Sequence, residues 1–243
     1  MYNLKTPSVF WRLALWYYQN EFLDLLFFSQ RKESDMPTEQ TIRAMTDAEY
    51  EVIYGSPIEP RAPADLFDYM VERLVSAKLA TYEHADSFRK RIPSNRRFIF
   101  VPPEPTTLDL VHLMSLIEFR GKTGQNCLNA ANLKNLIEVI QGPCLLLDVE
   151  DGRSRLKVNP VRSRETIAAE ERIPYTTFRG IIHAFLLPVL RHHNIDILGS
   201  QCDEKGVPVL CLNHEERPTL SGYWGGSANS EWGAPSCGSI LVV

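Results

Sequence analysis

Two cysteines in the C-terminal part of the chain are the best candidates for nucleophilic chemistry. Cys202 and Cys237 each lie beside glycine or turn residues rather than inside a strand. A reactive thiol needs a base that lowers its pKa and a third group that orients the base. His183 is a candidate base and Asp148 a candidate orienting carboxylate, but nothing in their spacing brings the four residues together. Further candidates for the base and the carboxylate are His192, His214 and Asp196.

A glycine-rich segment that carries aromatic residues is a candidate ligand site. Its aromatic members are Tyr223, Trp224 and Trp232, and its glycines are Gly222, Gly225, Gly226 and Gly233. Glycine lets backbone approach a ligand closely, and indole rings supply apolar area. The same composition also suits core tryptophans packed over tight turns. The segment therefore predicts either an aromatic-walled pocket or a tightly turned piece of core.

Two other chemistries fail on spacing. A phosphate-binding loop at Gly121-Lys122-Thr123 requires a glycine at position 116, which is leucine. A metal site that uses His192 and His193 is disfavoured because adjacent helical residues point about 100° apart. The spacing of Cys202 and Cys211 across a predicted hairpin does not match structural zinc either. We therefore expect no metal and no cofactor.

Composition limits the class of partner and the compartment. With 26 basic and 30 acidic residues, the net charge of -4 provides no general field for nucleic acid. The local basic run Arg89-Lys90-Arg91 is more typical of a solvated boundary between domains. Five cysteines without a C-x-x-C pair, and the lack of any N-x-[ST] acceptor, favour a reducing, cytoplasmic setting.

The elements that would position these residues fall into three segments. Residues 1–35 form an apolar extension, in which Trp11, Leu15, Tyr18, Phe22 and Leu25 recur at helical spacing within an amphipathic helix over 9–28. That face requires a partner, which is the main domain, a second copy of the chain or a membrane surface.

Residues 36–95 form a helical segment. Thr46 and Glu49 read as a capping box, and Pro63 at a first helical position starts a stronger helix. Its buried stripe is predicted to contain Leu66, Met70, Leu74 and Ala77.

Residues 96–243 form the main domain. The predicted strands are 98–101, 113–119, 144–149 with a hairpin into 156–158, 195–200 paired with 207–212, and 239–243. The predicted helices are 163–171 and a second that starts near Thr176 and is bent at Pro188. Strands with inserted helices, without strict alternation, indicate an α+β fold with a mixed or antiparallel sheet.

From about residue 98 to 240 the chain resembles an uncharacterised bacterial family, frequent in actinobacteria and labelled only as a domain of unknown function. This chain departs from it in its N-terminal extension and at Tyr223-Trp224-Gly225-Gly226. The resemblance implies a compact cytoplasmic protein and carries over no catalytic role. The matching motifs are Phe119-Arg120-Gly121-Lys122, Leu145-Leu146-Leu147-Asp148-Val149-Glu150-Asp151-Gly152, Leu198-Gly199-Ser200-Gln201-Cys202, Val207-Pro208-Val209-Leu210, Trp224, Trp232-Gly233 and Ser236-Cys237-Gly238.

The leading hypothesis is a cytoplasmic bacterial binding or interaction protein with a glycine and aromatic surface near the C-terminus. Its partner is an unknown small molecule or protein. The alternative is a thiol-dependent hydrolase or transferase that uses a Cys/His pair.

Overall fold

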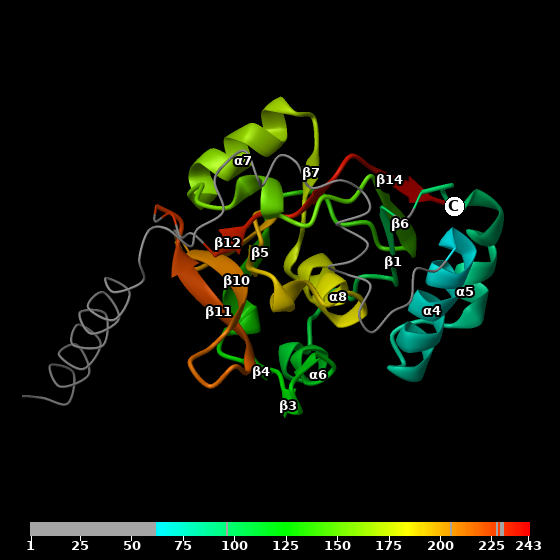
Figure 1. Cartoon of the computed structure of the whole chain (residues 1–243), viewed down its shortest axis with the longest axis horizontal. Helices are drawn as coiled ribbons and strands as arrows, with labels where there is room; N and C mark the ends of the chain where they lie inside the picture. The colour runs from blue at the N-terminus through cyan, green and yellow to red at the C-terminus, as the bar shows by residue number, and fades with distance from the viewer. Residues whose placement is uncertain (1–61, 96, 205, 227, 229–230) are drawn as a thin grey trace, which may run out of the picture. The chain divides into compact units, whose positions relative to one another are not determined.

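The computed structural model describes residues 62–95, 97–204, 206–226, 228 and 231–243 (Figure 1). The predicted extension 1–35, its helix 9–28 and the capping box at Thr46 lie outside the described residues. The α-helices are α4 Pro63–Ser76, α5 Tyr82–Asp86, α6 Leu110–Ser115, α7 Pro160–Ala169 and α8 Thr177–Leu186. The 3-10 helices are η2 Arg89–Arg91, η3 Ala130–Asn132, η4 Arg153–Arg155 and η5 Val189–Arg191.

The strands form two main sheets, and the fold is α+β as predicted. A three-stranded antiparallel sheet has the order β1-β6-β14, and a larger mixed sheet has the path β12-β8-β10-β11-β4 with β9 and β5 beside it. The strands are β1 Phe98–Val101, β2 Glu118–Phe119, β3 Lys122–Thr123, β4 Gln125–Asn126, β5 Leu133–Asn135, β6 Cys144–Leu147, β7 Ile173–Pro174, β8 Asn194–Asp196, β9 Ser200–Cys202, β10 Gly206–Leu212, β11 Pro218–Trp224, β12 Trp232–Gly233, β13 Ser236–Cys237 and β14 Ser239–Val242.

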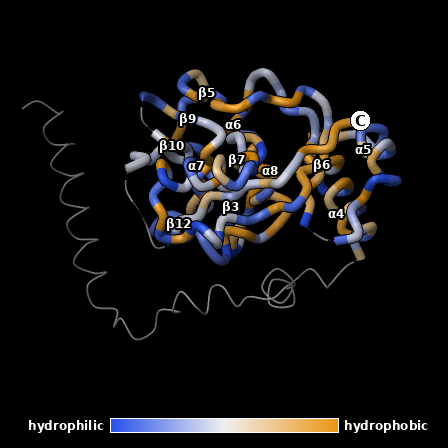
Figure 2. Tube along the Cα trace, turned by 90° about the horizontal axis from the view of Figure 1, so that it is seen from above, coloured by the Kyte–Doolittle hydropathy of each residue, from blue (hydrophilic) through white to orange (hydrophobic). Residues whose placement is uncertain are grey.

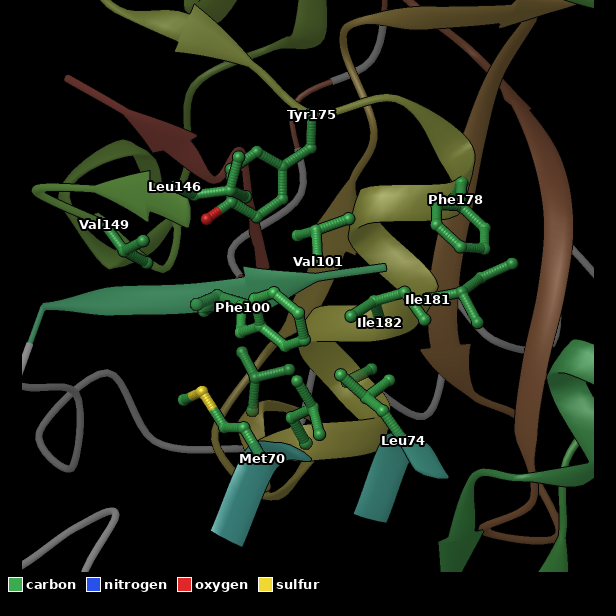
Figure 3. Packing of buried hydrophobic residues seen from close by; sticks show 14 of the residues in the cluster. Met70, Leu74, Phe100, Val101, Leu146, Val149, Tyr175, Phe178, Ile181 and Ile182 are labelled. Atoms are coloured by element: carbon green, nitrogen blue, oxygen red, sulfur yellow. The ribbon is translucent and has the colours of Figure 1, made fainter. Parts of the chain in front are cut away.

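Helix α8 links the two sheets, because it contacts both β1 and β10. Figure 3 shows Ile181 and Ile182 of α8 beside Phe100 and Val101 of β1. Met70 of α4 belongs to the same core and lies below Phe100 in this view. Helix α4 buries the predicted Leu66, Met70 and Leu74, whereas Ala77 is only half-buried at its C-cap. The helical segment and the main domain therefore share one hydrophobic core.

Pro188 ends helix α8 instead of bending it. The helix stops at Leu186, and Leu187 adopts an extended conformation with φ -125° and ψ 143°. The ring of a proline disfavours a helical conformation at the residue before it. The short helix η5 follows, so Arg191 and His192 do not continue α8.

Two further predictions about elements are wrong. The apolar run 113–119 was predicted to be a strand. Its first part belongs instead to helix α6, and only Glu118 and Phe119 form a strand. The predicted hairpin from 144–149 into 156–158 is absent from the described residues, because β6 pairs with β1 and β14. The turn after β6 leads into η4 instead of a returning strand. The partners of β6 are β1 and β14, which lie far from it in the sequence.

Helix α7 covers part of the larger sheet through a second, smaller hydrophobic cluster. Ile167 of α7 packs there with Val207 and Val209 of β10, and Trp232 lies against them. Figure 2 shows the matching contrast along the chain, with hydrophobic (orange) stretches such as β6 and hydrophilic (blue) stretches in many turns. Within the described residues, no helix combines the length and the hydrophobicity that a membrane span requires.

Candidate functional site

A surface pocket of about 280 Å³ lies where helix α7 meets the ends of β10 and β11. Its apolar walls are Val161 of α7, Val207 of β10 and Trp224 of β11. Val161 and Trp224 are among the few large hydrophobic side chains that the described residues expose, at 50% and 63%. The remaining lining residues are Arg164, Gln201, Glu204, Gly206, Gly225 and Gly226.

The indole of Trp224 owes its position to glycine. A Cβ added to Gly226 would meet ring carbons of Trp224 at 2.6 to 2.8 Å, so the indole lies over this residue. Trp224 pairs with Gly206 at the end of the β10–β11 ladder. A Cβ on Gly206 would lie 2.3 Å from the carbonyl oxygen of Cys202. Gly226, one of the glycines predicted to allow close approach, therefore serves the packing of the indole, and Gly206, which was not predicted, serves the packing of the backbone beside the pocket.

Tyr223 and Trp232 do not line this pocket. Their rings pack against each other with centroids 5.0 Å apart, beside the cluster that Ile167 and Val207 form. Neighbouring residues of a strand point to opposite faces, which separates Tyr223 from Trp224. The segment thus contains both features that the sequence left open, a pocket wall at Trp224 and packed aromatic rings at Tyr223 and Trp232.

Arg164 is the cation of the pocket. Its Nε donates a 3.2 Å hydrogen bond to the carbonyl oxygen of Leu198, which fixes one edge of the guanidinium. Burial lowers the pKa of Arg164. Among the described residues it has no carboxylate partner, whereas the partly buried Arg153 and Arg172 each have one. Neither Arg164 nor Val161 was predicted as a site residue, although their spacing of three residues places them on one face of α7.

The candidate nucleophiles are buried thiols. Burial raises the pKa of Cys202 and raises that of Cys237 to about 12, and the charge of Asp148 adds to the latter shift. Cys237 Sγ faces the carbonyl oxygen of Ile173 at 3.8 Å. Within the described part of the chain, no hydrogen bond joins a cysteine to a histidine. These environments favour the neutral thiol and oppose the thiolate that nucleophilic catalysis requires.

The proposed base and its carboxylate lie in different surroundings. His183 is fully buried in α8, where burial lowers its pKa to about 4, and its ring centroid is 5.7 Å from that of Tyr175. Asp148 accepts a 2.7 Å hydrogen bond from Arg172 at the end of β6. The structure therefore brings Asp148 near Cys237, around Gly238, but joins neither of them to His183.

A buried group of ionisable side chains was not predicted as a unit. His193 Nε2 lies 3.6 Å from Asp151 Oδ2, which is beyond hydrogen-bond range, so this contact is electrostatic. Burial alone would raise the pKa of Asp151, but His193 and Arg153 outweigh it and hold that pKa well below its usual range. Burial raises the pKa of Asp196 to about 7, which the charge of His193 only partly offsets. The group is enclosed, with Asp151 and Asp196 at 3% and 2% exposure.

A groove between α4 and α8 is partly filled by the side chain of Arg73. Arg73 places its guanidinium 4.4 Å from the ring centroid of Phe185 and donates to the Tyr69 hydroxyl at 3.4 Å. The two pockets recorded there, of about 340 and 470 Å³, share Arg73 and Phe185 in their walls. Because Arg73 already covers the ring of Phe185, a ligand that stacked there would have to displace this cation–π contact.

The described residues contain no group of three His, Cys, Asp or Glu side chains placed to hold a metal ion. No protein-family profile, curated protein or solved structure matches the chain. The resemblance over residues 98–240 therefore stays a prediction.

Proposed function

We propose that this protein binds a small ligand with a flat apolar face in the pocket beside Trp224. One observation carries the proposal: the indole of Trp224 is 63% exposed and forms a wall of a pocket together with the exposed Val161. Large exposed apolar side chains that share one concave surface are typical of binding sites. Packing against the core would instead have covered the indole.

The size of the pocket favours a small molecule over a protein surface. At about 280 Å³ it lies near the lower end of the roughly 300–1,000 Å³ typical of ligand pockets. A ligand of one or two fused rings matches this volume and can stack on the indole.

The proposal includes a reducing, cytoplasmic location. All five cysteines lie within the described residues, and all five are free thiols. Free buried thiols are typical of proteins kept in a reducing compartment.

Binding of aromatic fragments is the test. Ligand-observed NMR with single-ring and two-ring compounds is expected to give hits that compete for one site. Trp224→Ala is expected to weaken them by about tenfold or more, since an exposed tryptophan wall supplies much of the contact energy. Val111→Ala is the matched control, because it removes another exposed apolar side chain, 70% exposed, away from the pocket. If Trp224→Ala is folded and binds the compounds as tightly as the wild type, the proposal is contradicted.

A further inference from the structure

We infer that the ligand of the Trp224 pocket is an aromatic monocarboxylate, whose carboxylate pairs with Arg164 while its ring stacks on Trp224. This inference rests on the proposed function and adds the charge of the ligand to it. It follows from the contacts of Arg164 in the pocket wall, compared with those of Arg153, Arg155 and Arg172, and from the position of the pocket in the fold.

Arg164 has no carboxylate partner among the described residues, in contrast to Arg153, Arg155 and Arg172. The half-buried Arg73 and Arg217 have none there either, and contact the ring of Phe185 and the carbonyl oxygen of Thr123 instead. Arg153 is 2.7 Å from Asp151, and Arg172 is 2.7 Å from Asp148. Arg155 also bridges two carboxylates, those of Glu150 and Glu170. Among the described residues, Arg164 contacts only a neutral carbonyl, that of Leu198. An unneutralised guanidinium in a pocket wall is the feature that an anionic ligand group would complete, because charge-assisted hydrogen bonds from arginine to an anion are shorter and stronger than neutral ones.

The surroundings of Arg164 favour the binding of an anion and disfavour that of a cation. Val161 stands in the first turn of α7, so the positive end of this helix dipole borders the pocket. Glu204 also lines the pocket but is exposed on the turn before β10, where water screens its charge. Arg164 is half-buried, and a charge in a partly desolvated place interacts more strongly than one in water.

The number of charges selects a monoanion. One arginine compensates one negative charge, whereas a phosphate ester carries up to two near neutral pH. A carboxylate also matches the planar fork of the guanidinium. Trp224 and Val207 supply the apolar contact, so the ligand class is a carboxylate attached to an aromatic ring.

A set of matched ligands separates this inference from the proposed function. The probes are 2-naphthoate, 2-naphthamide, 2-naphthyl phosphate and 2-naphthylmethylammonium, measured by isothermal titration calorimetry. Wild type is expected to bind the carboxylate about tenfold or more tightly than the neutral amide, since one charge-assisted contact distinguishes them. Arg164→Gln is expected to abolish this preference, so that the variant binds the carboxylate and the amide equally.

Arg162→Gln is the control, since it removes the same charge from an exposed position on the same helix outside the pocket. Arg164→Lys keeps the charge and is expected to retain part of the preference, which covers the case in which Arg164→Gln fails to fold. Equal binding of carboxylate and amide would overturn the inference and leave the proposed function standing. Tighter binding of the ammonium or the phosphate would also overturn it. Binding of none of the probes would contradict both.

Discussion

The indole of Trp224 lies over the backbone of Gly226, within 2.6 Å of where a Cβ of residue 226 would stand. The contact is made by the far end of an exposed side chain, so a larger residue at 226 would displace the indole rather than disrupt the core. The orientation of the pocket wall is thus coupled to one glycine in the turn after β11.

Gly226→Ala is therefore expected to reduce binding of aromatic ligands severalfold with little loss of stability. The added methyl group moves the indole off its position above the turn, and the melting temperature stays within about 2 °C of wild type, since surface changes rarely exceed about 0.5 kcal/mol. Fragment binding by NMR and thermal denaturation provide the two measurements. Gly142→Ala is the control, because a Cβ there meets no atom within 4 Å. Unchanged binding in Gly226→Ala would separate the indole position from ligand binding.

Gly152→Ala is expected to destabilise the protein strongly. Gly152 has φ 109°, and its Cβ would lie 2.8 Å from the carbonyl carbon of Gly233, which is backbone of β12 and cannot turn away. Gly121→Ala isolates the conformational part, since Gly121 has φ 75° with open space around it. We expect a loss of about 1–2 kcal/mol at Gly121 and about 2 kcal/mol or more beyond that at Gly152. Urea denaturation measures both, and equal losses would show that the close approach of the backbone at Gly152 and Gly233 is unimportant.

His183 is expected to make stability fall as the solution is acidified. Its folded pKa, about 4, lies below the usual 6.5, so the unfolded chain takes up a proton first between these values. By linkage this removes up to about 3 kcal/mol from the free energy of unfolding as the pH falls from 6.5 to 4. The measurement is the difference in pH slope between wild type and His183→Gln. His214→Gln, with its side chain 87% exposed, should not change the slope.

Asp196 is expected to act in the opposite sense. Its folded pKa, about 7, lies above the usual 3.8, so the folded state favours the protonated carboxyl and stability decreases as the pH rises between these values. Asp196→Asn should remove this decrease, which amounts to a few kcal/mol by linkage. Exposed Asp65 provides the control as Asp65→Asn. Because His183 and Asp196 oppose each other, the wild-type profile is flatter than either variant's, and a steep wild-type profile would contradict this pairing.

The thiols are expected to differ sharply in reactivity. Cys127 is exposed, whereas burial raises the pKa of Cys144 to about 11 and that of Cys237 to about 12. In a native assay with a disulfide reagent at pH 8, Cys127 should react first, and Cys127→Ser should remove that rapid phase. Rapid modification of Cys202 or Cys237 in the folded protein would instead revive the thiol-dependent alternative.

Local pattern predicted much of the secondary structure. The run Phe98–Val101 is strand β1, and the stripe of Leu66, Met70 and Leu74 is the buried face of α4. These predictions hold because a periodic apolar pattern and a proline at a first helical position act over a few residues. The predicted continuation of α8 past Pro188 is wrong, because the residue before a proline leaves the helical region of backbone conformation. This effect is also local.

By itself, the sequence determined the α+β class and most elements, but it left open whether the aromatic segment 222–233 forms a pocket wall or packed core. Only the tertiary structure decided that Trp224 would face Arg164 while Tyr223 packs on Trp232, and that Cys237 and His183 would remain unpaired with each other. The physical reason is distance along the chain. Helix α7 and the end of β11 meet only because the smaller hydrophobic cluster joins Ile167 to Val207, and no spacing between neighbouring residues records that contact.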